Sequence, residues 1–271
     1  MAKISENERQ AYSERVKSYV DVTKALLKTE KDLAQEARKK PSEAPMIKLA
    51  LADEMLNLAS NYIAVNGVSQ ALLRVKNEES LNDARKSLYK AVIYLEEIVS
   101  NLIDVPFSDY EDKLKLIVDF DPNQRYNLIR KLGFSIDLLV HTYGDNTKWR
   151  WTFVELEGRF ATAAKNILDL KNVYTNSSPE SPYYDSTVYH LRLVKKLLNQ
   201  SADRYREKYE LSTSQFSDFK TGISYLAALR RIHIVLAEAE ESESIKKKHA
   251  IWKQKLEADM KKQEEMKKRG M

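Results

Sequence analysis

The stretch that decides the fold runs from residue 81 to residue 102 and reads LNDARKSLYKAVIYLEEIVSNL. Its apolar residues recur in alternating steps of three and four, a period typical of a helix that packs nearly parallel to its neighbours. Ala84 and Ala91 alternate with larger residues, so a second helix can approach closely on that side. The seam consists of Leu81, Ala84, Leu88, Ala91, Leu95, Ile98 and Leu102.

Similar helical faces lie on both sides of this seam. One begins near Tyr12 and ends near Lys40, a second runs from Ile47 to Val65, and later ones lie between residues 126 and 239. A helix of about 25 residues is a rod roughly 40 Å long. Such rods bury their apolar faces most readily against one another. The sequence therefore predicts an all-α fold, an antiparallel bundle of six to eight long helices with a projecting C-terminal helix.

Local signals mark where these helices begin and end. Ser5 and Glu8 have the spacing of a capping box, and Pro122 suits the first position of a helix. Proline stops the first helix within KPSEAP, residues 40–45. The most loop-like segment is TNSSPESP, residues 175–182, a possible sub-boundary. The expected organisation is a helical body over residues 1–240, followed by a charged helical tail over residues 241–271.

Composition excludes several classes of protein. The chain has 6 Gly, 6 Pro and no Cys. Without cysteine there can be no disulfide and no thiolate metal site. The glycines are isolated, so no phosphate-binding loop of the P-loop or dinucleotide type is present. Residues 1–15 carry charges where a signal peptide needs an apolar segment, and no run of about 18 apolar residues could span a membrane. A soluble, cytoplasmic protein is expected.

Candidate catalytic and metal-binding residues do not form a recognisable pattern. None of the histidines has a second histidine or a glutamate at the spacing that helical metal sites need. Asp119, Asp121 and Asn123 resemble the start of a calcium loop, but Gln124 and Arg130 occupy the places of its Gly and Glu. Acids at the start of a helix account for them equally well. We therefore expect no enzyme activity and no cofactor. The four histidines are His141, His190, His233 and His249.

The positive charge of the chain is concentrated in its last residues. The formal net charge is +5, and residues 246–269 hold ten Lys or Arg against four Asp or Glu. The rest of the chain is therefore close to −1. Trp252 belongs to a thin apolar stripe on this segment, with Ile245, Leu256 and Met260. The candidate binding residues are Lys246, Lys247, Lys248, Trp252, Lys253, Lys255, Lys261, Lys262, Lys267, Lys268 and Arg269.

Two functions fit these observations. The first is a non-catalytic helical scaffold or adaptor that binds another protein, and its basis is the long seam and the absent catalytic motifs. The second is a polyanion-binding module that applies the basic tail to nucleic acid or to an acidic membrane surface. Acids interrupt the basic face, which favours the first. The stripe predicts a solvated or partner-docking tail that folding does not need, and oligomers are possible.

Overall fold

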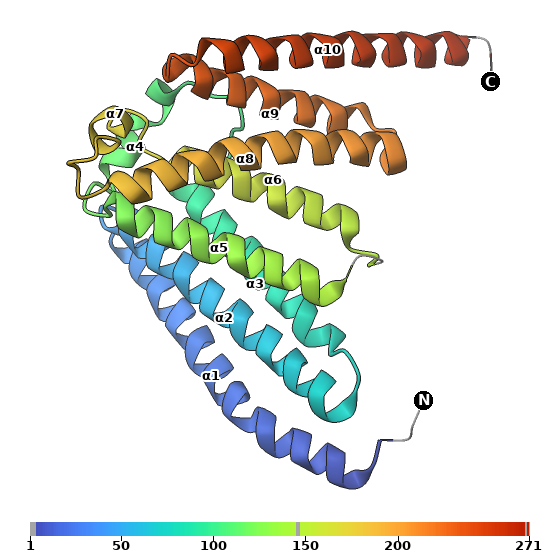
Figure 1. Ribbon diagram of the computed structural model, residues 1–271. Coiled ribbons are helices and arrows are strands. Elements are labelled where there is room, and N and C mark those ends of the chain that lie inside the picture. The colour runs from blue at the N-terminus through green and yellow to red at the C-terminus, as the bar shows by residue number, and fades with distance from the viewer. Residues whose placement is uncertain (1–3, 145–146, 269, 271) are drawn as a thin grey trace. The chain divides into compact units, whose positions relative to one another are not determined.

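The computed structural model describes residues 4–144, 147–268 and 270 of the chain (Figure 1). Helices make up 82% of it, and the described residues contain no strand, so the all-α prediction is confirmed. The helices are α1 (Glu6–Lys39), α2 (Ala44–Leu73), α3 (Glu78–Ile98), α4 (Glu111–Lys115), α5 (Pro122–Tyr143), α6 (Arg150–Ile167), α7 (Val173–Asn176), α8 (Tyr184–Lys208), α9 (Phe216–Val235) and α10 (Ala239–Lys268). A 3₁₀ turn covers Phe107–Asp109, and a π-helical turn, Tyr209–Thr213, extends α8.

Several predicted helix ends are confirmed. Ser5 and Glu8 form the capping box of α1, and Pro122 lies at the start of α5. Asp121 caps α5 by accepting a hydrogen bond of 2.9 Å from the backbone N–H of Gln124. This carboxylate therefore satisfies one of the N–H groups that a helix start leaves without a partner in the helix.

The chain forms two compact units. The first unit contains residues 1–100 and 112–148, and the second contains residues 101–111 and 149–271. The predicted sub-boundary at residues 175–182 lies inside the second unit, between α7 and α8. No described helix is both long and apolar enough to cross a membrane.

In the first unit, α2 packs against both α1 and α3, and α5 contacts α2 and α3. The predicted seam forms the buried side of α3 from Leu81, which is 0% exposed, to Ile98, which is 3% exposed. The last seam residue was predicted wrongly: Leu102 is 58% exposed. The reason is that α3 ends at Ile98, and residue 102 already belongs to the second unit.

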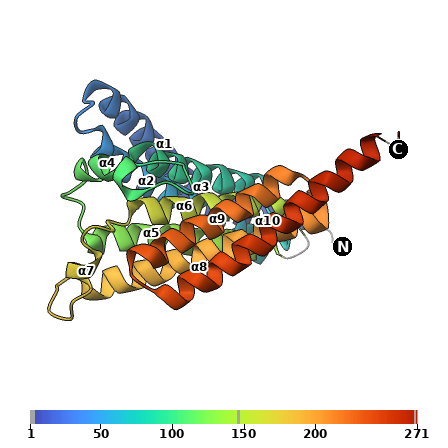
Figure 2. The same cartoon turned by 90° about the horizontal axis from the view of Figure 1, so that it is seen from above.

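In the second unit, α8 packs against α6 and α9, and α9 packs against α10. Gly222 of α9 lets that helix approach α8, since a Cβ there would lie 3.0 Å from the carbonyl oxygen of Ala202. Figure 2 shows α10 lying along this unit, with its last turns extending beyond α8 and α9.

Candidate functional site

The basic C-terminal helix is docked over most of its length. Trp252 is 2% exposed and Leu256 is 7% exposed, and the flanking Ile245 and Met260 are half-buried. The expectation of a solvated tail is therefore wrong for α10 up to Met260. Spacings of seven and four residues place these four side chains on one side of the helix. One of the four is Trp252, and its indole ring buries more surface area than an aliphatic side chain does.

Trp252 lies within a cluster of aromatic and cationic side chains. Its ring centroid is 5.7 Å from that of Phe219, which in turn stacks on Tyr209 at 4.9 Å. The guanidinium of Arg206 lies 5.2 Å from the indole, and the ammonium of Lys248 lies 5.0 Å from it. The indole of this candidate binding residue is thus surrounded from within the unit.

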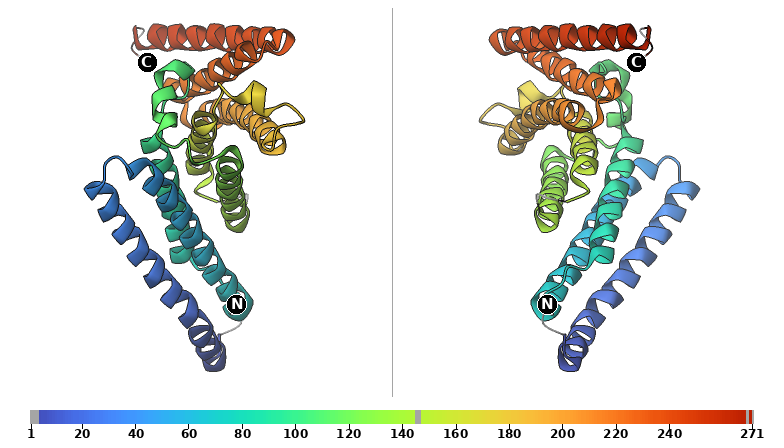
Figure 3. Two further views of the ribbon diagram at one scale, coloured as in Figure 1. Left: turned by 90° about the vertical axis from the view of Figure 1, so that its left-hand side faces the viewer. Right: turned by 90° about the vertical axis from the view of Figure 1, so that its right-hand side faces the viewer.

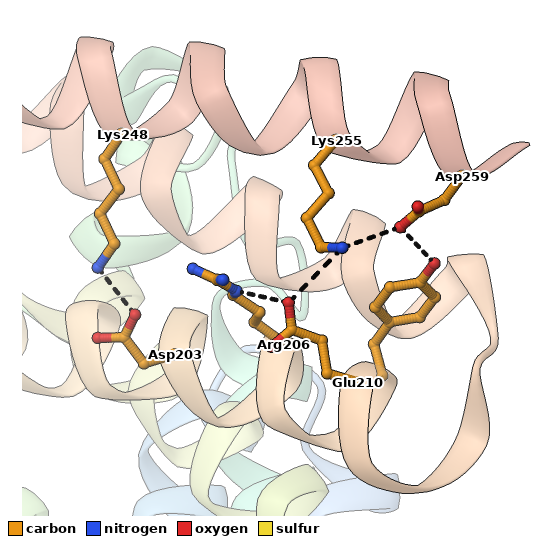
Figure 4. Close-up of polar contacts among 7 residues, drawn as sticks. Asp203, Arg206, Glu210, Lys248, Lys255 and Asp259 are labelled. Atoms are coloured by element: carbon orange, nitrogen blue, oxygen red, sulfur yellow. Dashed lines mark hydrogen bonds and ion pairs between the residues drawn. The ribbon is translucent and has the colours of Figure 1, made fainter.

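Two of the candidate lysines form a polar seam between α10 and α8 (Figure 4). Lys248 makes an ion pair of 2.8 Å with Asp203. Lys255 lies 3.2 Å from Asp259 and 3.9 Å from Glu210. The contacts with Asp203 and Glu210 therefore link α10 to α8 and its π-helical turn, whereas Asp259 lies on α10 itself.

The hydroxyl of Tyr209 extends this seam. It donates a hydrogen bond of 2.9 Å to the carboxylate of Asp259. Burial and this carboxylate raise the pKa of Tyr209 to about 12. Burial opposes ionisation of Asp259, but the hydrogen bonds from Tyr209 and Lys255 outweigh it and lower the pKa of the carboxyl. Asp259 is thus held as a carboxylate.

The remaining candidate cations that the structure describes are exposed, and acids lie among them. Lys246 pairs with Glu243 at 3.0 Å, and Arg269 lies outside the described residues. The other exposed lysines are Lys247, Lys253, Lys261, Lys262, Lys267 and Lys268. With about 100° per residue, the half of α10 opposite Trp252 carries Lys246, Lys247, Lys253, Lys261 and Lys268 together with Glu240, Glu243, Glu257, Glu264 and Glu265. The outward half of α10 is therefore close to neutral.

The turn into α10 depends on contacts that the sequence did not point out. Ala237 has a φ of 57°, a left-handed conformation that ends α9. The carboxylate of Glu238 lies 2.6 Å from both Lys195 Nζ and His233 Nδ1. Burial opposes ionisation of Glu238, but the hydrogen bonds from Lys195 and His233 outweigh it and lower its pKa. His233 thus has a structural partner. Lys195 is 43 residues from Glu238, so no local pattern could have revealed the contact.

The first helix presents a second surface of interest. One side of α1 contacts its own unit: Asn61 of α2 donates hydrogen bonds to the carbonyl of Tyr19 and to Thr23, and Lys90 of α3 pairs with Glu30 at 2.8 Å. No residue of α1 is fully buried. Figure 3 shows α1 along an edge of the first unit, beside α2.

About a quarter turn from that contact lies a row that we call the basic flank of α1. It consists of Lys17, Val20, Lys24, Leu27 and Lys31, in steps of three and four. All five are exposed, with Val20 at 44% and Leu27 at 40%. The spacing of these five residues was visible in the sequence, but the apolar stripe through Tyr12, Tyr19 and Leu26 was the more prominent pattern on the same helix.

Comparison with protein families matches residues 8–260 to the TP0443 family. The chain belongs to the TP0443 family. Searches of curated proteins and of solved structures gave no significant match. The family description names neither an activity nor a ligand.

The family match has a structural counterpart. It includes the basic flank of α1 and both units, and it ends at Met260, the last half-buried residue of α10. The exposed turns at 261–268 lie beyond it. Within the described residues, no group of three or more His, Asp or Glu is placed to hold a metal ion.

Proposed function

We propose that this TP0443-family protein is a non-catalytic helical adaptor that binds an acidic amphipathic helix of a partner protein along the basic flank of α1. The observation that carries the proposal is the exposed alternation of Lys17, Val20, Lys24, Leu27 and Lys31. Apolar residues at this spacing form one half of a helix–helix seam, and the charges beside such a seam select the partner. A cytoplasmic location is part of the proposal.

Charge decides the kind of partner. Lys24 lies 3.8 Å from Asp21, but both side chains are largely exposed, so this ion pair contributes little. Lys17 and Lys31 have no ion pair within the described residues. Two copies of this flank would bring lysines together across the seam, which disfavours a homodimer there. A helix that alternates leucine with glutamate complements both the charge and the spacing.

The test uses a synthetic helical peptide with Leu and Glu in alternating steps of three and four, and a twin in which Lys replaces Glu. Fluorescence anisotropy measures the affinity of each for the full chain. The acidic peptide should bind, and the double variant Val20→Ser/Leu27→Ser should weaken binding by about tenfold or more.

The matched control is Val22→Ser, because Val22 lies on the opposite flank of the same helix and is 46% exposed. It should leave the affinity unchanged. Equal binding of the basic twin, or a loss with Val22→Ser as large as with the double variant, would reject this docking surface.

A further inference from the structure

The last turn of α6 contains a buried lysine that no contact explains. Lys165 is 3% exposed, and its ammonium lies 5.2 Å from the ring centroid of Tyr110. Within the described residues its side chain makes no hydrogen bond and no ion pair. Lysine is almost never buried without a partner, because taking an ammonium out of water is costly.

The surroundings only partly offset this cost. A cation near a helix C-terminus gains a modest stabilisation, and so does a cation over an aromatic ring. The cost of removing an ammonium from water exceeds both together. In keeping with this imbalance, burial lowers the pKa of Lys165 to about 8. An anionic partner would therefore stabilise the charged form of this amine.

Lys165 faces a small internal cavity that borders a larger groove. The cavity has a volume of about 20 Å³, enough for one water-sized group. Lys165, Tyr110 and Arg231 form its polar part, and Phe107, Leu170 and Ile232 are among its apolar walls. Beside it lies a groove of about 370 Å³, and both spaces are lined by Arg231 and Val235.

The groove is cationic with an apolar wall. Arg230 lines it, and the Nε of that side chain is buried without a hydrogen-bond partner in the described part of the chain. His249 lies there too, with its pKa lowered by burial and by the nearby Lys253 and Arg230. The acid that lines the groove is Asp104, and its carboxylate already forms an ion pair of 2.9 Å with the guanidinium of Arg231.

We propose that the cavity and the groove together bind a small organic carboxylate. One carboxylate oxygen enters the cavity and accepts a hydrogen bond from Lys165, and the other faces Arg231. The hydrocarbon body lies in the groove against Ile234 and Val235. A carboxylate fits because the cavity admits a single oxygen, whereas the adjoining volume lies in the range of small-molecule sites. The site lies within the second unit and does not depend on the proposed docking of a partner helix on α1.

Isothermal titration calorimetry at pH 7 tests this on the full chain, with hexanoate and benzoate as probes and their amides as uncharged twins. The carboxylates should bind saturably, and each amide should bind at least tenfold more weakly. Lys165→Met keeps the length of the side chain without its charge and should weaken carboxylate binding at least tenfold. The control is Lys220→Met, because Lys220 is exposed on α9. It should bind like the wild type.

The pH dependence in the unmutated protein gives a second measurement, free of any folding defect. Between pH 7 and 9.5 the ligand stays ionised while Lys165, with a pKa of about 8, loses its proton, so affinity should fall several-fold. Of the groups facing the site, Tyr110 has a pKa raised by burial, His249 has a lowered pKa, and the hydrogen bond with Asp104 raises the pKa of Arg231. The proposal would be overturned if the amides bound as well as the carboxylates, or if no carboxylate bound saturably. It would also be overturned if the affinity did not change with pH, or if a folded Lys165→Met variant bound the carboxylates like the wild type.

Discussion

At the scale of single residues, Trp252 shows how much one side chain contributes to the second unit. It meets the ring of Phe219, the guanidinium of Arg206 and the ammonium of Lys248 at once. The indole therefore closes one end of the aromatic cluster. Its neighbour Ile251 is 63% exposed, so two consecutive residues of α10 have opposite environments.

Trp252→Ala should lower the free energy of unfolding by about 3–5 kcal/mol, because it leaves a cavity where a large ring was buried. The measurement is equilibrium unfolding in urea, monitored by circular dichroism. Ile251→Ala is the control and should change stability by less than about 0.5 kcal/mol. Similar effects of the two substitutions would mean that α10 does not dock through Trp252.

The sequence could not reveal the environments of Trp252 and Lys165. The stripe containing Trp252 was visible, but a stripe of four residues fits a solvated helix as well as a docked one. Its burial depends on Phe219 and Arg206, which lie 33 and 46 residues away. Lys165 was not singled out at all, because a lysine near the end of a helix is ordinary. Only the fold reveals that Tyr110 and Phe107 cover it.

At the scale of elements, the features that arise from local chemistry were predictable. The capping box at Ser5 and Pro122 at the start of α5 act within one helical turn, so short sequence windows contain them. The division into two units was not predictable in this way. An apolar face shows that a helix packs, but not which helix it meets, and the end of α3 before Leu102 depends on that choice of partners.

The docked and exposed parts of α10 make different contributions to stability. A chain ending at Met260 should keep the melting temperature of the full chain, because residues 261–268 are exposed. A chain ending at Ser244 loses Trp252 and Leu256 and uncovers Phe219, so its melting temperature should fall by roughly 10 °C. Differential scanning calorimetry of both variants measures this. If the shorter chain melts like the full one, the contacts of α10 with α8 and α9 do not contribute to stability.

At the scale of the whole molecule, the distribution of charge matters more than its sum. The net charge is +5, and the sequence concentrates the positive charge in the tail. In the structure, Lys248 and Lys255 are paired with acids of the second unit. On the outward half of α10, lysines and glutamates lie together, so their fields largely cancel beyond a Debye length of about 8–10 Å. The exposed lysines beyond the docked part of α10 are Lys261, Lys262, Lys267 and Lys268.

This distribution predicts that binding to nucleic acid is weak and that its affinity depends only modestly on salt concentration. Each phosphate that a protein neutralises adds about −0.9 to the slope of log affinity against log salt. Engagement of all ten cations of residues 246–269 would give a slope of about −9. The four distal lysines alone would give about −4, and because they lie on different sides of the helix, a duplex can reach fewer of them at once.

We therefore expect a slope no steeper than about −4 with a short DNA duplex, measured by fluorescence anisotropy between about 25 and 200 mM NaCl. Replacing the four distal lysines by glutamine should remove most of this salt dependence, whereas Lys246→Gln/Lys247→Gln should leave most of it in place. A slope near −9 would show instead that α10 leaves its docked position to meet the polyanion.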